Sequence, residues 1–115
     1  MDTDDYNSKY DARKQLVKNF AEMYCTACLI VDLYKNAGTV EENQVFIKQK
    51  SNFIYLFERI LSCCSADTRF IITNTFVRRE KEDWYIPFYS RSSYYRIKKE
   101  AIEEFNAVVE KLKNN

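Results

Sequence analysis

Apolar side chains recur at steps of three and four residues through the first third of the chain, the spacing that gathers them on one side of a helix. Over residues 10–35 this stripe comprises Val17, Phe20, Tyr24, Ala27, Cys28, Val31 and Tyr34. The pattern stops at Asn36-Ala37-Gly38, and Gly38 stands where a left-handed helix C-cap is expected. We therefore predict a long first helix over residues 10–35.

A second stripe with the same spacing begins after a short turn. It comprises Phe46, Phe53, Leu56, Phe57, Ile60 and Cys64. Thr39 is a suitable N-cap for this helix, and Glu41 and Glu42 would lie in its first turn, where the helix dipole favours negative charge. Helices joined by so short a connection pack antiparallel. Residues 10–64 are therefore predicted to form a helical hairpin.

The next part of the chain predicts two shorter helices separated by a charged loop. Ser65 can cap a third helix that ends at about residue 77. Its buried side would comprise Phe70, Ile71, Thr73, Phe76 and Val77. Residues 78–83 are charged and predict the loop. The spacing of Trp84 and Phe88 favours a fourth helix over residues 84–89, but Pro87 lacks an amide hydrogen and restricts Ile86, so an irregular or extended segment is the alternative.

The last third of the chain predicts a long fifth helix with Ser90 as its N-cap. Its apolar face comprises Tyr94, Ile97, Ala101, Phe105, Val108 and Leu112, and the opposite side of the helical wheel holds Ser92, Tyr95, Arg96, Lys99 and Glu103. The aromatic side chains of this region should therefore divide into a buried set and an exposed one. Trp84, Phe88, Tyr94 and Phe105 are predicted to be buried, and Tyr95 to be exposed.

Composition agrees with an all-α protein of five helices. One glycine and one proline are too few for the many tight turns of an all-β domain. A hydrophobic content of 46% argues against disorder, and 115 residues suffice for one core. We predict a single domain over residues 1–115, in which the hairpin of residues 10–64 packs on a helix-turn-helix over residues 65–113.

Location follows from the apolar runs and from the first residues. No apolar run approaches the roughly 20 residues of a membrane-spanning helix, so we expect no membrane association. The beginning of the chain, MDTDDYNSKYDARK, is polar and acidic and does not resemble a secretory signal. These features predict a cytoplasmic protein with reduced cysteines.

The residue types needed for common catalytic sites are scarce. The chain has no histidine, and its single glycine cannot build a glycine-rich phosphate loop, so we expect neither an enzyme, nor a cofactor, nor a small-molecule substrate. Four thiolates from Cys25, Cys28, Cys63 and Cys64 could in principle bind zinc. Since Cys28 lies on the apolar stripe and adjacent cysteines are awkward tetrahedral ligands, buried thiols without a metal are the favoured interpretation.

Positive charge gathers in the second half of the chain. From Arg78 to Lys99 there are seven basic residues against three acidic ones. Serine hydroxyls and amides at the start of the fifth helix would favour an anion, and the neighbouring arginines and lysines could neutralise phosphates or reach guanine edges. The alternative is a solvated basic face whose lysines pair with nearby glutamates.

The segment WYIPFYSRSSYYRIKKEAIEEF strengthens the first interpretation. With the preceding Arg69-Phe-Ile-Ile run, it resembles DNA-binding region 4 of sigma factors and the ArpU-type phage transcriptional regulators. Ser90 matches the turn serine of these families, and Ala101, eleven residues later, matches a small residue that packs on the preceding helices. The phrase YSRSSYYRIKKEAIEEF is also similar to a small uncharacterised family of helical proteins from bacteria with reduced genomes. The joint lacks the customary glycine, and Tyr85 replaces a small residue, which predicts an unusual angle between the two helices.

The resemblance implies a non-enzymatic transcriptional regulator that binds duplex DNA with a helix-turn-helix. The predicted groove contacts are Arg91, Ser92, Tyr95, Arg96 and Lys99, and the predicted phosphate contacts are Ser93, Lys98, Arg78 and Arg79. The alternative function is a helical protein-interaction module. Aromatic surface left over after packing would suit a homodimer or a larger partner such as RNA polymerase.

Overall fold

The computed structural model describes residues 3–114, with side chains from residue 7 onward. Within this range the chain forms four α-helices and no β-strand, which confirms the all-α class and shows that the prediction of five helices is wrong. The helices are α1 (Thr3–Ala37), α2 (Gln44–Ser62), α3 (Ala66–Ile72) and α4 (Arg91–Lys113). A 3-10 turn, η1 (Glu41–Asn43), precedes α2, and a π-helical turn, η2 (Thr73–Val77), extends α3 to the predicted end of the third helix.

The predicted hairpin is present, and its turn is set by Gly38. This glycine has φ +70°, and its amide donates to the Lys35 carbonyl at 3.1 Å. The Thr39 amide donates to the Tyr34 carbonyl, also at 3.1 Å, which completes a Schellman C-cap. The prediction that Thr39 caps the second helix is wrong, because its hydroxyl donates back to Tyr34 at 3.4 Å. Helix α2 accordingly begins only at Gln44, after η1.

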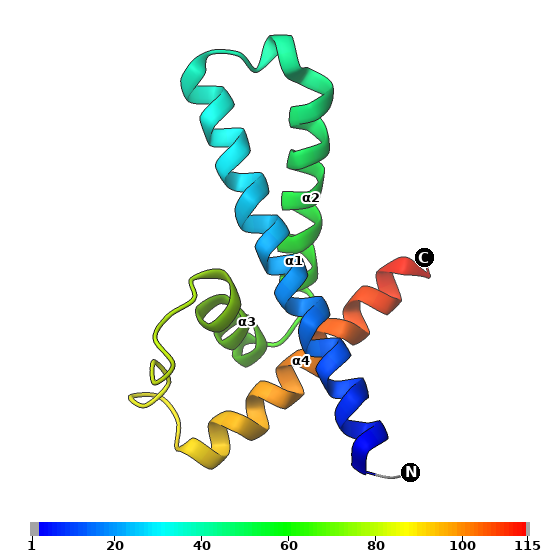
Figure 1. Cartoon of the computed structure of the whole chain (residues 1–115), viewed down its shortest axis with the longest axis vertical. Helices are drawn as coiled ribbons and strands as arrows, with labels where there is room; N and C mark the ends of the chain where they lie inside the picture. Colours follow the sequence, from blue (N-terminus) through cyan, green and yellow to red (C-terminus); the bar gives the residue numbers. More distant parts are fainter. Residues whose placement is uncertain (1–2, 115) are drawn as a thin grey trace.

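The helices cross at one end of the hairpin. Figure 1 shows α1 and α2 side by side and antiparallel, with α4 crossing the lower part of α1 and α3 lying beside α4. A side-chain clamp holds the crossing, since Arg13 forms a salt bridge of 2.9 Å with Glu103 and Asn106 donates to the Arg13 carbonyl at 3.1 Å. The part of α1 around Arg13 therefore covers part of α4.

The hydrophobic core lies where the four helices meet. Its buried members are Val17, Ala21, Phe57, Ile60, Ile71, Ile72, Phe76, Ala101, Ile102 and Phe105. The ring of Phe105 lies 5.9 Å from those of Phe20 and Phe57, so one side chain of α4 joins both helices of the hairpin. The predicted burial of Ala101 is confirmed, and it is fully inaccessible to solvent.

The predicted fourth helix over residues 84–89 is a succession of turns. The amides of Trp84 and Ile86 donate to carbonyls three residues back, at 3.0 and 3.2 Å. Pro87 has no amide hydrogen and disfavours helical geometry at Ile86, so a continuous ladder of bonds to the fourth preceding carbonyl does not form, although the Tyr89 amide donates to the Tyr85 carbonyl at 3.0 Å. Helix α3 and η2 are thus joined to α4 by an irregular segment of residues 78–90.

Within residues 3–114, no helix has both the length and the apolar character required to span a bilayer.

Candidate nucleic-acid interface

The start of α4 is fixed by Ser90, as predicted. Ser90 has extended backbone geometry, and its hydroxyl accepts a hydrogen bond from the Ser93 amide at 3.2 Å. This cap satisfies one of the free amides of the first turn. The amide of Ser93 is therefore already used by the cap, and its side chain is half-buried.

An aromatic cluster braces the first two turns of α4 from behind. Tyr94 is buried, and its ring stacks on that of Tyr85 with 3.8 Å between centroids and 3° between planes. Trp84 contacts Tyr94 edge-on at 5.8 Å. Tyr85 therefore fills the joint and supports the helix. The prediction that Phe88 is buried is wrong, because its ring is 61% exposed and lies edge-on against Phe70 at 5.1 Å.

Four of the predicted groove contacts share the outer face of α4. Arg91, Ser92, Tyr95 and Arg96 are all exposed. The guanidinium of Arg91 lies 5.9 Å from the Tyr95 ring centroid, and Arg96 makes one solvent-exposed pair of 3.4 Å with Glu100. Such an exposed pair contributes at most about 1 kcal/mol, so Arg96 can leave it at little cost to reach a ligand.

Lys99 and Glu103 follow on the same side of α4 but are only half exposed, because α1 partly covers this side. Glu103 forms the salt bridge with Arg13 of α1, and the Lys99 ammonium lies 6.0 Å from the ring centroid of Tyr10. The start of α1 crosses α4 at this level (Figure 1). A helical wheel cannot show that a neighbouring helix covers this side.

Lys98 is half-buried in the angle between the helices and the aromatic cluster. Its ammonium lies 6.0 Å from the Phe76 ring and 5.8 Å from the Tyr94 ring. Burial lowers its pKa, the positive charge of Lys14 lowers it further, and Glu82 partly opposes both effects. Lys98 is thus held beside another cation, in cation–π contact with two rings.

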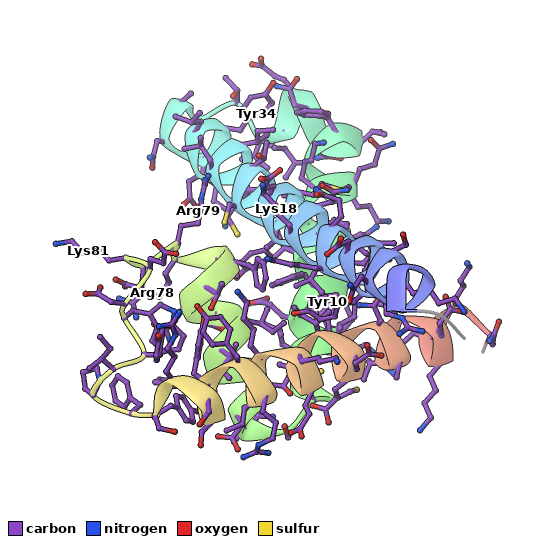
Figure 2. The ribbon with its side chains drawn as sticks, turned by 60° about the horizontal axis from the view of Figure 1, so that its bottom comes forward. Tyr10, Lys18, Tyr34, Arg78, Arg79 and Lys81 are labelled. Carbon is purple, nitrogen blue, oxygen red and sulfur yellow. The ribbon has the colours of Figure 1, made fainter. Side chains whose placement is uncertain are left out.

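The segment that follows η2 carries the predicted backbone contacts Arg78 and Arg79. Both are exposed, as is Lys81, and Figure 2 shows all three on this segment, with Arg79 nearest to α1 and Lys81 pointing away from it. Arg78 pairs with Glu80 at 3.4 Å. Arg79 has φ +49°, a left-handed conformation uncommon for a residue with a side chain, which turns the chain sharply at this point.

Two carboxylates lie close to the start of α4. Glu82 and Asp83 line a shallow depression together with Tyr85, Arg91 and Tyr95. These acidic residues reduce the positive potential at the helix start. Further exposed positive charge lies toward α1 and on residues 78–81, where Arg78 pairs with Glu80.

Lys14 and Lys18 of α1 are basic residues that the sequence analysis missed. Both are exposed, and Figure 2 shows Lys18 on the side of α1 that is seen together with Arg78, Arg79 and Lys81. Their spacing of four residues could have identified them from the sequence as a basic pair, because it places both on one face of a helix. Only the folded arrangement shows that this face adjoins the basic segment.

The four cysteines lie in two separate regions of the described chain. The Cys25 thiol donates to the Val77 carbonyl at 3.6 Å, and the Cys64 thiol donates to the Ile60 carbonyl at 3.3 Å. Burial, followed by the charges of Glu104 and Cys63, raises the pKa of Cys64 to about 11. Among the side chains of residues 7–114, no three cysteine, aspartate, glutamate or histidine residues gather as a metal-binding group.

Glu104 ties α4 to the joint between α2 and α3, which makes stability depend on pH. Its carboxylate accepts a hydrogen bond of 2.7 Å from the Ser65 amide. Burial alone would raise the pKa of Glu104, but hydrogen bonds from Ser65 and Thr68 and the charge of Arg69 bring it below its ordinary value of 4.5. A lowered folded-state pKa stabilises the fold above about pH 4.5 and loses this contribution as the pH falls through the folded value.

Glu104→Gln should therefore unfold more easily than the wild type at pH 7, and the difference should shrink at pH 3. Thermal unfolding at the two pH values measures it. Glu110→Gln, an exposed substitution on the same helix, is the control and should leave the melting temperature nearly unchanged. A Glu104→Gln deficit of equal size at both pH values would contradict the role of the charged carboxylate.

No protein-family model matches the chain, and no curated protein or solved structure shows significant similarity to it. The resemblance to sigma-factor region 4 and to ArpU-type regulators therefore stays a prediction that depends on the residues of the second half alone.

Proposed function

We propose that the chain binds duplex DNA through the N-terminal half of α4 and acts as a non-enzymatic transcriptional regulator. The observation that carries the proposal is the two-sided character of this half-helix. Its outer face presents Arg91, Ser92, Tyr95 and Arg96 to solvent, while Tyr94 on its inner face is stacked on Tyr85. A helix held rigidly from behind can keep polar and basic side chains in register with base edges.

The neighbouring segment supplies the second requirement, which is contact with phosphates. Arg78 and Arg79 are exposed immediately after η2, and phosphate contacts position a reading helix without specifying sequence. In the predicted helix-turn-helix, a short helix over residues 84–89 preceded the reading helix. In the folded chain, α3, η2 and the aromatic turns pack behind α4, and we propose that they support the reading helix in place of that short helix.

The resemblance supports the same function through two positions. Ser90 acts as an N-cap, the role expected of a serine at the turn, and Ala101 is fully buried against the other helices, the environment expected of the small residue. Lys99 is withdrawn from the proposed groove contacts because it lies against Tyr10. Lys98 stays a proposed phosphate contact, at the inner edge of the surface.

Arg96→Gln should weaken binding to preferred duplexes by roughly 1–3 kcal/mol, since a bidentate arginine–guanine contact contributes about that much. Purified protein would be mixed with pooled 30-base-pair duplexes at two salt concentrations, and the bound fraction sequenced. Wild-type binding should fall steeply with salt. The variant should lose both affinity and the enrichment of particular sequences.

Lys111→Gln is the matched control, because it removes one positive charge from an exposed position at the other end of α4. It should bind like the wild type. If the wild-type protein bound no duplex at the lower salt concentration, the proposed function would be wrong. If Arg96→Gln and Lys111→Gln behaved alike, α4 would not be the reading element.

A helical protein-interaction module is the second candidate, and exposed apolar side chains on the hairpin favour it. Met23, Leu29, Leu33 and Tyr55 are each more than half exposed. Exposed apolar surface of this kind suits a second copy of the chain or a larger partner such as RNA polymerase. The duplex-binding experiment at two salt concentrations separates the two candidates, because a pure interaction module has no salt-sensitive affinity for duplex DNA.

A further inference from the structure

Lys14 and Lys18 bring α1 into the basic surface. The charge of Lys14 acts on Lys98 of α4, which places these two residues close together. Helix α1 also packs against η2, where the Cys25 thiol donates to the Val77 carbonyl at 3.6 Å. In Figure 2, Lys18 lies on the visible side of α1, with Arg78, Arg79 and Lys81 on the adjoining segment.

This surface, which we call the α1 track, has more cations than its own carboxylates can neutralise. It comprises Lys14, Lys18, Arg78, Arg79, Lys81 and Lys98. Its acidic neighbours are Glu80 and Glu82 on the segment after η2, and Asp11 and Glu22 on the same side of α1, which leaves a net charge of +2. Among residues 7–114, the only one of these cations with a carboxylate within salt-bridge distance is Arg78, which pairs with Glu80.

Gathering like charges is unfavourable for the protein alone. Lysines four residues apart on a helix repel each other, and Lys98 is held half-buried next to Lys14. The contacts of Lys98 with two rings and of Arg78 with Glu80 offset only part of this repulsion, whereas a polyanion would turn it into attraction. The track adjoins α4 through Lys98 and the proposed phosphate contacts through Arg78 and Arg79, so it continues the surface already assigned to DNA.

We propose that α1 supplies a further set of phosphate contacts, with Lys14 and Lys18 binding the DNA backbone beside the phosphates bound by Arg78 and Arg79. The duplex then lies across α1 and α4 together. This inference rests on the proposed function. Lys14 and Lys18 are about 6 Å apart along the helix axis, so the two ammonium groups are far enough apart to bind different phosphates.

The test is the salt dependence of DNA binding by Lys14→Gln/Lys18→Gln. Each phosphate contact lowers the slope of log K against log[salt] by about 0.9, so the double variant should have a slope less negative by about 1.8. Its affinity at 0.1 M salt should fall by on the order of tenfold or more, equally for preferred and random duplexes. Both lysines are exposed, so circular dichroism should show an unchanged fold.

Lys35→Gln/Lys48→Gln removes the same total charge from exposed positions in the two helices of the hairpin, outside the track, and is the control. It should keep the wild-type slope. A second readout uses the unmodified protein: bound duplex should protect Lys14 and Lys18, but not Lys35, from acetylation as detected by mass spectrometry.

The outcomes separate the two proposals. Suppose that the wild type binds duplexes and that Arg96→Gln lowers its affinity. If Lys14→Gln/Lys18→Gln then keeps the wild-type salt slope and bound duplex does not protect either lysine from acetylation, the proposed phosphate contacts of α1 are wrong and the proposed function of α4 stands. If the wild type binds no duplex, both proposals fail. A slope change in the track variant that the control does not share supports the inference.

Discussion

Phe105→Ala should lower the free energy of unfolding by about 3–5 kcal/mol, because truncating a buried phenylalanine loses its transfer free energy and leaves a cavity. Phe105 is fully buried and lies 5.9 Å from both Phe20 and Phe57, so the cavity would open where α4 meets both helices of the hairpin. A domain of this size is stable by only roughly 5–15 kcal/mol, so the loss is a large part of the total. Urea unfolding followed by circular dichroism measures it.

Two variants make this result interpretable. Phe88→Ala makes the same chemical change at a ring that is 61% exposed and should cost less than about 1 kcal/mol. Phe105→Leu keeps most of the volume and should cost less than about 1.5 kcal/mol, which provides a folded variant if Phe105→Ala does not fold. Equal losses for Phe105→Ala and Phe88→Ala would contradict the position of the core.

Tyr94→Ala is expected to have the second-largest effect, again about 3–5 kcal/mol, because it removes a buried ring from the aromatic cluster behind α4. The lost contacts include the stack on Tyr85 at 3.8 Å and the edge contact with Trp84 at 5.8 Å. Aromatic pairs contribute about 0.5–1.5 kcal/mol beyond their buried area. The first turns of α4 should therefore open locally, and hydrogen exchange at the amides of residues 94–98 should become faster.

Tyr94→Phe is the matched control, since it keeps the ring and removes a hydroxyl whose contact with Thr75 is long, at 3.5 Å. It should cost less than about 1 kcal/mol and leave hydrogen exchange unchanged. Under the proposed function, Tyr94→Ala should also weaken duplex binding although Tyr94 itself is buried, whereas Tyr94→Phe should not. If hydrogen exchange at the amides of residues 94–98 were as slow in Tyr94→Ala as in the wild type, the aromatic cluster would not anchor the start of α4.

Local sequence features predicted the helices that depend on local forces. The apolar stripes located α1, α2 and α4, and the serines at positions 65 and 90 marked two helix starts because their hydroxyls accept hydrogen bonds from amides three residues later. Gly38 marked the end of α1, since a left-handed residue is needed there. These features act within one turn of the chain, so no tertiary contact is needed to recognise them.

The incorrect predictions concern segments in which distant residues compete with local preference. Trp84 and Phe88 have helical spacing, yet Pro87 and the packing of Trp84 and Tyr85 against Tyr94 produce turns. Glu103 has the position of a solvent-exposed residue, yet Arg13, ninety positions earlier, pairs with it. Thr39 is the exception, because its reason is local: the Schellman turn orients its hydroxyl toward Tyr34, five residues earlier.

The sequence alone determined the all-α class, the hairpin, two serine caps and the exposed basic residues at the start of α4, because periodicity and capping are local properties. Only the tertiary structure decided which of those basic residues stay accessible. It covers Lys99 with α1, holds Lys98 between two rings, and brings Lys14 next to Lys98 across more than eighty residues. The physical reason is that the crossing of α1 over α4 depends on the fit of buried side chains such as Phe105, and this fit follows from no single segment of the chain.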